Sequence, residues 1–88
     1  MTTATTSRLT PRAAFAALGY ALTDQPREER RDAFGRPVVT RWCRITPAAC
    51  SRIGATGEGP DDATAEERLD NDLRATLRGL LACAEADA

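Results

Sequence analysis

Three cysteines are the strongest nucleophiles of the chain, and there is no histidine to activate them. Cys43, Cys50 and Cys83 form an odd set without the C-x-x-C spacing of zinc and redox motifs. The missing histidine excludes Ser-His-Asp and Cys-His catalysis and histidine metal ligation, so we expect no enzyme, no cofactor and no metal. Three separate thiols are typical of a reducing cytosol, where cysteine packs as a small apolar residue. A Cys₃ metal site completed by a carboxylate is the alternative.

Seven carboxylates in the segment 58–72 are the next groups that could do chemistry. Only Arg68 opposes them, so the segment has a net charge of −6. Nothing apolar nearby would raise the pKa of one carboxylate, as an acid–base pair requires. Carboxylates in the first turn of a helix complement its dipole, and the functional alternative is an acidic surface that binds an arginine-rich partner. The candidate residues on this surface are Asp61, Asp62, Glu66 and Asp70.

A basic segment precedes the acidic one. Residues 27–52 contain seven arginines and three carboxylates, a net charge of +4 in a chain whose total is −1. Arginine and tryptophan are enriched at protein–protein hot spots, and an arginine-bearing β-ribbon can also enter a DNA groove or bind phosphates. A solvated strand edge, kept soluble by its arginines, is the structural alternative. The candidate residues here are Arg36, Arg41, Trp42 and Arg44.

A β-hairpin is the element that must position these arginines. Residues 32–45 contain the β-branched run and the single tryptophan of the chain, with glycine and proline at a turn. We predict strands over 30–34 and 38–45 that are joined at Gly35-Arg36, with Pro37 opening the second strand. Arginines interrupt both faces of 38–45, so the pattern does not show which face is buried.

Helices are predicted on both sides of the hairpin. Thr10-Pro11 and Thr46-Pro47 each place a capping threonine before a proline, which predicts helices over 11–22 and 47–53. The repeat is either ordinary capping chemistry or a trace of internal duplication. Thr64 and Glu67 form a capping box, and leucines at helical spacing predict a long amphipathic helix over 64–84 with an Asp70–Arg74 ion pair.

The predicted fold class is α+β, in the order N-terminal helix, β-hairpin, short helix, long C-terminal helix. Residues 1–8 form a disordered Thr/Ala-rich tail, and 9–88 form one small domain with a flexible loop at 54–62. The loop is glycine-rich but lacks the lysine of a phosphate-binding loop. The predicted core comprises Leu9, Phe15, Leu18, Leu22, Phe34, Val38, Val39, Trp42, Ile45, Ile53, Leu69, Leu73, Leu77, Leu80 and Leu81.

Composition bears on location and assembly. No run approaches the roughly 20 apolar residues of a membrane span, and residues 13–22 are not followed by a clear cleavage site of a signal peptide. We therefore expect a cytoplasmic protein with no membrane partner. Because a core this small often needs a second copy to complete it, a homodimer that shares a helix face is a further alternative.

Two function classes fit these observations. The first is a non-enzymatic protein-binding module. The chain is rich in alanine and arginine and lacks lysine, which indicates a GC-rich bacterial or phage gene. Small proteins of phages and mobile elements often inhibit host complexes, as anti-CRISPR proteins do. We therefore expect a phage or mobile-element inhibitor that occupies a surface of a larger host nucleic-acid-handling complex, although no motif of such a family is present. The alternative is a small DNA-binding accessory or regulatory factor that uses the arginine-rich hairpin. Neither the partner nor the charged surface that contacts it follows from the sequence.

Overall fold

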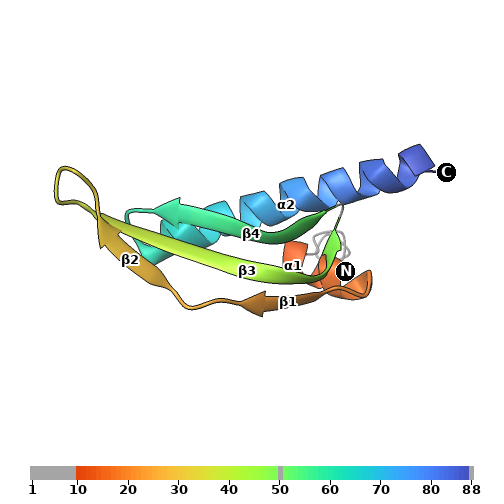
Figure 1. The fold of residues 1–88 in the computed structure, drawn as a ribbon, viewed down its shortest axis with the longest axis horizontal. Coiled ribbons are helices and arrows are strands. Elements are labelled where there is room, and N and C mark those ends of the chain that lie inside the picture. Colours follow the sequence, from red (N-terminus) through yellow and green to blue (C-terminus); the bar gives the residue numbers. More distant parts are fainter. Residues whose placement is uncertain (1–9, 50, 88) are drawn as a thin grey trace, which may run out of the picture.

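The fold is α+β, with four antiparallel strands and two helices (Figure 1). The computed structural model describes residues 10–49 and 51–87. The elements follow the order α1 (Pro11–Ala17), β1 (Ala21–Asp24), β2 (Glu28–Arg31), β3 (Pro37–Ala49), β4 (Arg52–Gly59) and α2 (Asp62–Asp87). The α+β class is therefore confirmed, whereas the predicted order is not. None of the described helices is long and apolar enough to cross a membrane.

The sheet is built around the long strand β3. β1 and β2 lie end to end along one edge of β3, with Leu22 opposite Ile45 and Glu29 opposite Val39. β4 pairs along the other edge, with Val39 opposite Gly59. Pro26 lies in the gap between β1 and β2, and because proline cannot donate to a ladder, this edge is divided into two short strands.

The core lies between α2 and one face of this sheet. Val39, Cys43 and Ile45 of β3 are buried there, and Arg41 lies between them on the same face. This result settles which face of the strand is covered. The buried residues of α2 recur at spacings of three and four, and Phe15 of α1 completes the cluster. The buried α2 residues are Ala65, Leu69, Leu73 and Thr76.

Glycines allow α2 to lie directly on β4. A Cβ at Gly57 would collide with the Ala65 carbonyl oxygen and the Leu69 nitrogen, and one at Gly59 would lie 2.6 Å from Cγ2 of Thr64. Glycine inside a strand often marks such a close approach of another backbone. The predicted loop over 54–62 is therefore wrong, because most of these residues belong to β4.

The predicted helix over 47–53 is also wrong. Residues 47–49 continue β3, and Ala49 pairs with Arg52 at the start of β4. Thr10 does cap α1, where its hydroxyl accepts the N–H of Ala13. Thr46 instead pairs with Ala21 in the sheet, so tertiary pairing overrides the local capping pattern. The resemblance between the two Thr-Pro sites therefore does not extend to their structure.

Both remaining helices have bounds that differ from those predicted. α1 ends at Ala17, because Gly19 adopts a φ of +94° in a turn and the chain then enters β1. α2 begins at Asp62 and runs to Asp87. Its N-cap is Asp61, whose carboxylate accepts the N–H of Thr64, so the predicted capping role of Thr64 is wrong.

Four predicted core side chains are exposed instead. Leu18 and Phe34 lie in the turns that follow α1 and β2, where the chain leaves the covered face of the sheet. Ile53 lies at the start of β4, and Leu81 lies in the C-terminal part of α2, outside the buried cluster. The predicted tail 1–8 and the core residue Leu9 lie outside the described residues.

Candidate partner-binding site

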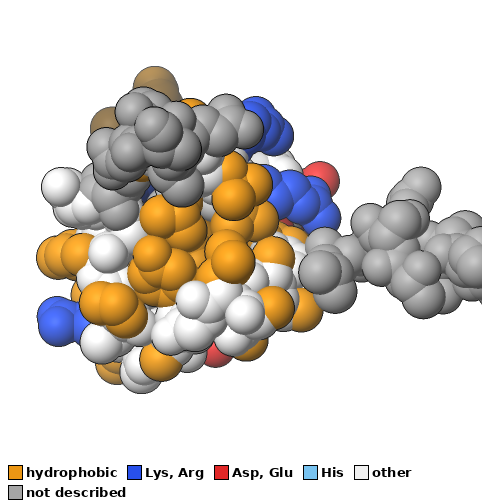
Figure 2. Space-filling view, turned by 90° about the vertical axis from the view of Figure 1, so that its right-hand side faces the viewer, with side chains coloured by type: hydrophobic (Ala, Val, Ile, Leu, Met, Phe, Trp, Pro, Cys, Tyr) orange, Lys and Arg blue, Asp and Glu red, His pale blue; other side chains and the backbone are white. Residues whose placement is uncertain are grey.

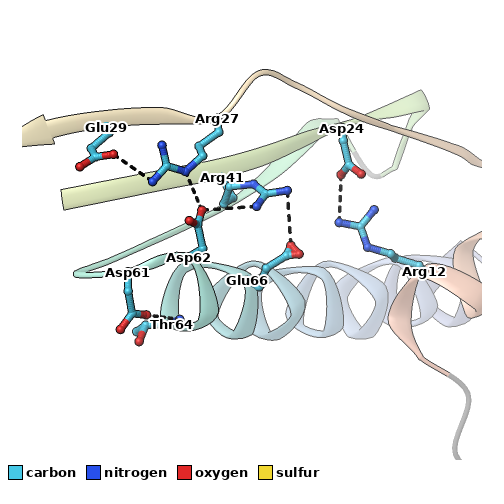
Figure 3. A network of polar contacts seen from close by, with 9 residues as sticks. All are labelled: Arg12, Asp24, Arg27, Glu29, Arg41, Asp61, Asp62, Thr64 and Glu66. Carbon is cyan, nitrogen blue, oxygen red and sulfur yellow. Dashed lines mark hydrogen bonds and ion pairs between the residues drawn. The ribbon is translucent and has the colours of Figure 1, made fainter. Parts of the chain in front are cut away.

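Residues of the predicted basic and acidic surfaces form ion pairs with each other at the surface of the folded chain (Figure 3). Arg41 of β3 lies 3.6 Å from Oδ1 of Asp62 and 3.8 Å from Oε1 of Glu66, measured from its guanidinium nitrogens. Arg27 donates to the same Asp62 oxygen at 2.7 Å and also pairs with Glu29 at 2.9 Å. The structure thus brings together Arg41, Asp62 and Glu66, and only 27% of the Arg41 side chain is exposed.

These contacts change the acidity of the start of α2. The hydrogen bond from Arg27 lowers the pKa of the Asp62 carboxyl below its ordinary value, and the nearby Arg41 acts in the same direction. Hydrogen bonds from the backbone and side chain of Thr64 lower the pKa of Asp61. Both carboxyls are therefore held in their charged form, and the network fastens the N-terminal end of α2 to the sheet.

Two further α2 side chains cover the outer edge of β4. Asp72 accepts the N–H of Thr56 at 2.9 Å, and Arg68 donates to the carbonyl oxygen of Glu58 at 2.7 Å. An uncovered strand edge is a template for pairing with another chain, so these contacts block that route at β4. Sequence reasoning missed Asp72, because no local pattern connects a helix residue to a strand sixteen positions earlier.

The turn between β2 and β3 forms a fixed projection at one end of the molecule (Figure 1). We call residues 32–36 the hairpin tip. Oδ1 of Asp32 accepts the N–H groups of Phe34 at 2.8 Å and Arg36 at 2.9 Å. Backbone bonds also join Gly35 and Arg36 to Asp32, and Gly35 takes a φ of +79° that glycine tolerates.

The tip presents an aromatic ring to solvent. Phe34 is 83% exposed, and the guanidinium carbon of Arg36 lies 5.8 Å from the centre of its ring. This distance is within the range of a cation–π contact. Sequence reasoning assigned Phe34 to the core and therefore missed it as a site residue. The signal was present, because Asp at the first position and Gly at the fourth favour a β-turn, whose central side chains point outward.

A hollow of about 290 Å³ lies beside the tip. It combines charged groups from the hairpin, β4 and α2 with apolar atoms of two prolines. This is enough room for one or two partner side chains. The lining residues are Asp32, Arg36, Pro37, Val38, Glu58, Gly59, Pro60 and Arg68.

The other predicted site residues do not join either cluster. Trp42 is half-buried on the face of the sheet away from α2, and a Cβ at Gly54 would lie 3.4 Å from its ring. Arg44 is exposed on the same face and takes part in none of the ion pairs between described residues. Asp70 likewise makes none of them, so the predicted Asp70–Arg74 pair is wrong.

The cysteines differ from one another. Cys43 is a buried free thiol, and burial raises its pKa, which makes it a poor nucleophile at neutral pH. Cys83 is disulfide-bonded, so the expectation of three free thiols is wrong for it, and Cys50 lies outside the described residues. Free thiols at all three cysteines can therefore no longer be used to argue for a reducing cytosol. Cytoplasmic localisation stays a prediction. Within 10–49 and 51–87, no three Asp, Glu or Cys side chains are grouped to hold a metal ion.

No protein-family model matches the chain, and the comparisons found no similar curated protein or solved structure. Function must therefore be inferred from the residues themselves. Two features distinguish the described surface: the arginines and carboxylates that neutralise each other, and the fixed tip that carries Phe34 and Arg36.

Proposed function

We propose that the protein is a non-enzymatic protein-binding module that docks through its hairpin tip. The observation that carries this proposal is the 83% exposure of Phe34 on a turn whose backbone Asp32 holds in place. Large aromatic side chains and arginine dominate the energetics of protein interfaces. A turn that is already ordered also loses little conformational entropy when it binds.

The chemistry of the tip indicates the kind of surface that it fits. Phe34 requires an apolar pocket, and the Arg36 guanidinium beside its ring favours carboxylates at the rim of that pocket. The Asp32 carboxylate is occupied by two backbone N–H groups. We therefore propose a protein partner with an acidic-rimmed apolar pocket. The narrower proposal is that this partner belongs to a larger nucleic-acid-handling complex, which the protein inhibits by occupying the surface.

Ion pairing within the chain favours a protein partner over DNA. Arg27, Arg30, Arg41 and Arg52 each contact a carboxylate of the same chain, at 2.7, 2.8, 3.6 and 3.1 Å respectively. DNA affinity depends on arginines and lysines that neutralise phosphates. The net charge of +4 over 27–52 is therefore largely compensated by the folded chain itself.

Affinity purification from a lysate of the organism that encodes the chain tests the proposal, with and without nuclease. The key variant is Phe34→Ala. Its matched control is Ile53→Ala, which also truncates an exposed apolar side chain, 63% exposed and at the other end of the sheet. We expect the wild type and Ile53→Ala to retain one protein in constant ratio, resistant to nuclease. Phe34→Ala should reduce the affinity for the retained partner by roughly 30-fold, as expected for the loss of a hot-spot residue.

Two outcomes would overturn the proposal. One is equal retention of the partner by Phe34→Ala and by the wild type, since the tip then carries none of the binding. The other is retained material that disappears on nuclease treatment and on substitution of Arg44, which has no carboxylate partner in the described structure. That result would favour the DNA-binding alternative.

A further inference from the structure

One edge of the sheet is uncovered at β2 (Figure 1). Among the described strands β2 pairs with β3 alone, and all of its residues, Glu28–Arg31, are exposed. The opposite edge of the sheet differs, because side chains of α2 bond to the backbone of β4 there. An uncovered strand edge is a template for pairing with a further strand. The edge of β2 is therefore a surface on which another chain can extend the sheet.

The backbone of β2 has outward-facing hydrogen-bonding groups at alternate residues. In an antiparallel ladder, residues whose N–H and C=O groups face the partner strand alternate with residues whose groups face away. Asp32, which follows β2, donates its N–H to the carbonyl oxygen of Arg36 at 3.0 Å, so the even-numbered residues face β3. In agreement, Arg31 lies opposite Pro37, which has no N–H to exchange. The N–H and C=O groups of Glu29 and Arg31 therefore point away from the sheet.

The charges of β2 are complementary to those of a second, antiparallel β2. The strand carries two glutamates followed by two arginines. Residues that exchange hydrogen bonds across a ladder must both have backbone groups that face the partner. Pairing Glu29 with Arg31 of a second copy meets this condition and joins opposite charges. A shift to the neighbouring registers places Glu29 opposite Glu29 or Arg31 opposite Arg31, and like charges directly opposite each other are destabilising.

The contacts of β2 within its own chain are compatible with this register. Arg31 donates to a backbone carbonyl at 2.8 Å but takes part in none of the ion pairs between described residues. Glu29 makes its ion pair through Oε1, and its carboxylate has a second oxygen. Arg30 would lie opposite Arg30 of the second copy, but Glu58 already neutralises it at 2.8 Å.

Hydrogen bonds and charge, rather than apolar burial, must hold a second chain at this edge. All four side chains of β2 are charged, and Figure 2 shows hydrophobic side chains gathered at the far end of the molecule. Charged residues on an edge strand usually prevent pairing. In β2 their order favours one occupant, because an antiparallel second copy presents arginine to glutamate on both sides of the axis.

We propose that two copies of the chain associate through β2, antiparallel about a two-fold axis, so that their sheets join into one. The axis makes the contact between Glu29 and Arg31 occur twice, which is how one self-complementary surface forms a closed dimer. Each of these pairs exchanges its backbone N–H···O bonds across the axis. This association goes beyond the function proposed for the tip and does not depend on the partner that binds there.

Sedimentation velocity over a range of concentrations tests the proposal with two complementary variants. Arg31→Glu leaves only glutamate at the paired positions, and Glu29→Arg leaves only arginine. Because both pairs of the dimer change from attractive to repulsive, each variant alone should associate at least about tenfold more weakly than the wild type. An equal mixture of the two variants should associate again, since every contact between unlike copies then joins opposite charges. Arg44→Glu makes the same charge change at an exposed residue of β3 and should leave association unchanged.

Amide hydrogen exchange of the wild type locates the contact without any substitution. The N–H groups of Glu29 and Arg31 should exchange more slowly as the protein concentration rises, because they become hydrogen-bonded only in the dimer. A dimer in which these two amides exchange at the monomer's rate would overturn the proposal, because the copies would then meet at another surface.

Far-UV circular dichroism must first show that each variant folds like the wild type. The proposal is overturned by a wild type that remains monomeric up to about 1 mM. It is also overturned if Arg31→Glu associates like the wild type, if Arg44→Glu weakens association as much as Arg31→Glu does, or if the mixture of complementary variants stays monomeric. A monomer whose β2 amides are protected only when the partner of the tip is added would assign this edge to that partner and overturn it as well.

Discussion

Replacing Gly57 of β4 by alanine tests how closely α2 packs against the sheet. The new Cβ would lie well inside 3.0 Å of the Ala65 carbonyl oxygen and the Leu69 nitrogen. Both are backbone atoms of a helix, so neither can rotate away as the end of a side chain can. The helix must therefore move away from β4, and the buried side chains of Leu69 and Leu73 must move with it.

The cost follows from what this movement disrupts. Inserting one extra carbon into a packed core costs about 1–3 kcal/mol, and more where the backbone must shift. We therefore expect Gly57→Ala to lower the free energy of unfolding by about 3 kcal/mol. In a domain of this size, 1 kcal/mol corresponds to roughly 4–8 °C in Tm. The Tm should accordingly fall by about 12–24 °C.

Gly79→Ala is the matched control. It makes the same chemical change within α2 itself, where the new Cβ would meet no atom within 4 Å. Alanine is favoured over glycine inside a helix by up to about 1 kcal/mol, so this variant should be slightly more stable. Urea unfolding followed by circular dichroism and by Trp42 fluorescence measures both. If Gly57→Ala retains a Tm within about 2 °C of the wild type, α2 does not contact β4 in the way described.

Three further predictions concern the tip, the charge network and the buried thiol. Asp32→Ala removes the acceptor of two N–H groups. It should lower the free energy of unfolding in urea by about 1 kcal/mol and weaken partner capture. Asp32→Asn keeps an acceptor oxygen and should change both quantities little. The hydrogen bond from Arg27 lowers the pKa of Asp62 in the folded state below its ordinary value of 3.8. The ionised Asp62 carboxylate therefore contributes its full stabilisation above about pH 3.8, and this stabilisation is lost as the pH falls through the lowered pKa of the folded state. Asp62→Asn should accordingly reduce the drop in urea midpoint between neutral pH and about pH 2. Cys43 is buried with a raised pKa, so iodoacetamide should label it only as fast as the protein unfolds; labelling of the native protein at the rate of a free thiol would contradict its burial.

The sequence was informative where local pattern and tertiary structure agree. The α+β class and the strand that begins near Val38 follow from β-branched residues and a turn signal. A helix was predicted over 64–84, and α2 occupies 62–87. Local signals failed where long-range contacts decide the structure. Thr46-Pro47 has the pattern of a helix start, but its neighbours pair in the sheet.

The glycines of β4 show why residues 54–62 were predicted incorrectly. Gly54, Gly57 and Gly59 were assigned to a flexible loop because glycine is common in loops. Each instead lies where a side chain would collide, with the Cys43 carbonyl oxygen, with the backbone of α2 and with Thr64 respectively. The three glycines therefore mark positions where another part of the chain packs too closely for a side chain. This can be recognised only once the position of α2 is known.

Charge segregation also has a different meaning in the folded chain. The sequence separates arginines in 27–52 from carboxylates in 58–72, and two separate binding surfaces were expected. The fold places these segments together, so that Arg41 contacts Asp62 and Glu66. Charges that neutralise each other within a chain have less to contribute to a partner. The residues that we propose for partner recognition, Phe34 and Arg36, are therefore ones that take no part in this ion-pair network. For the same reason a variant that disrupts the network should act first on stability, whereas Phe34→Ala should act on binding and leave the Tm nearly unchanged.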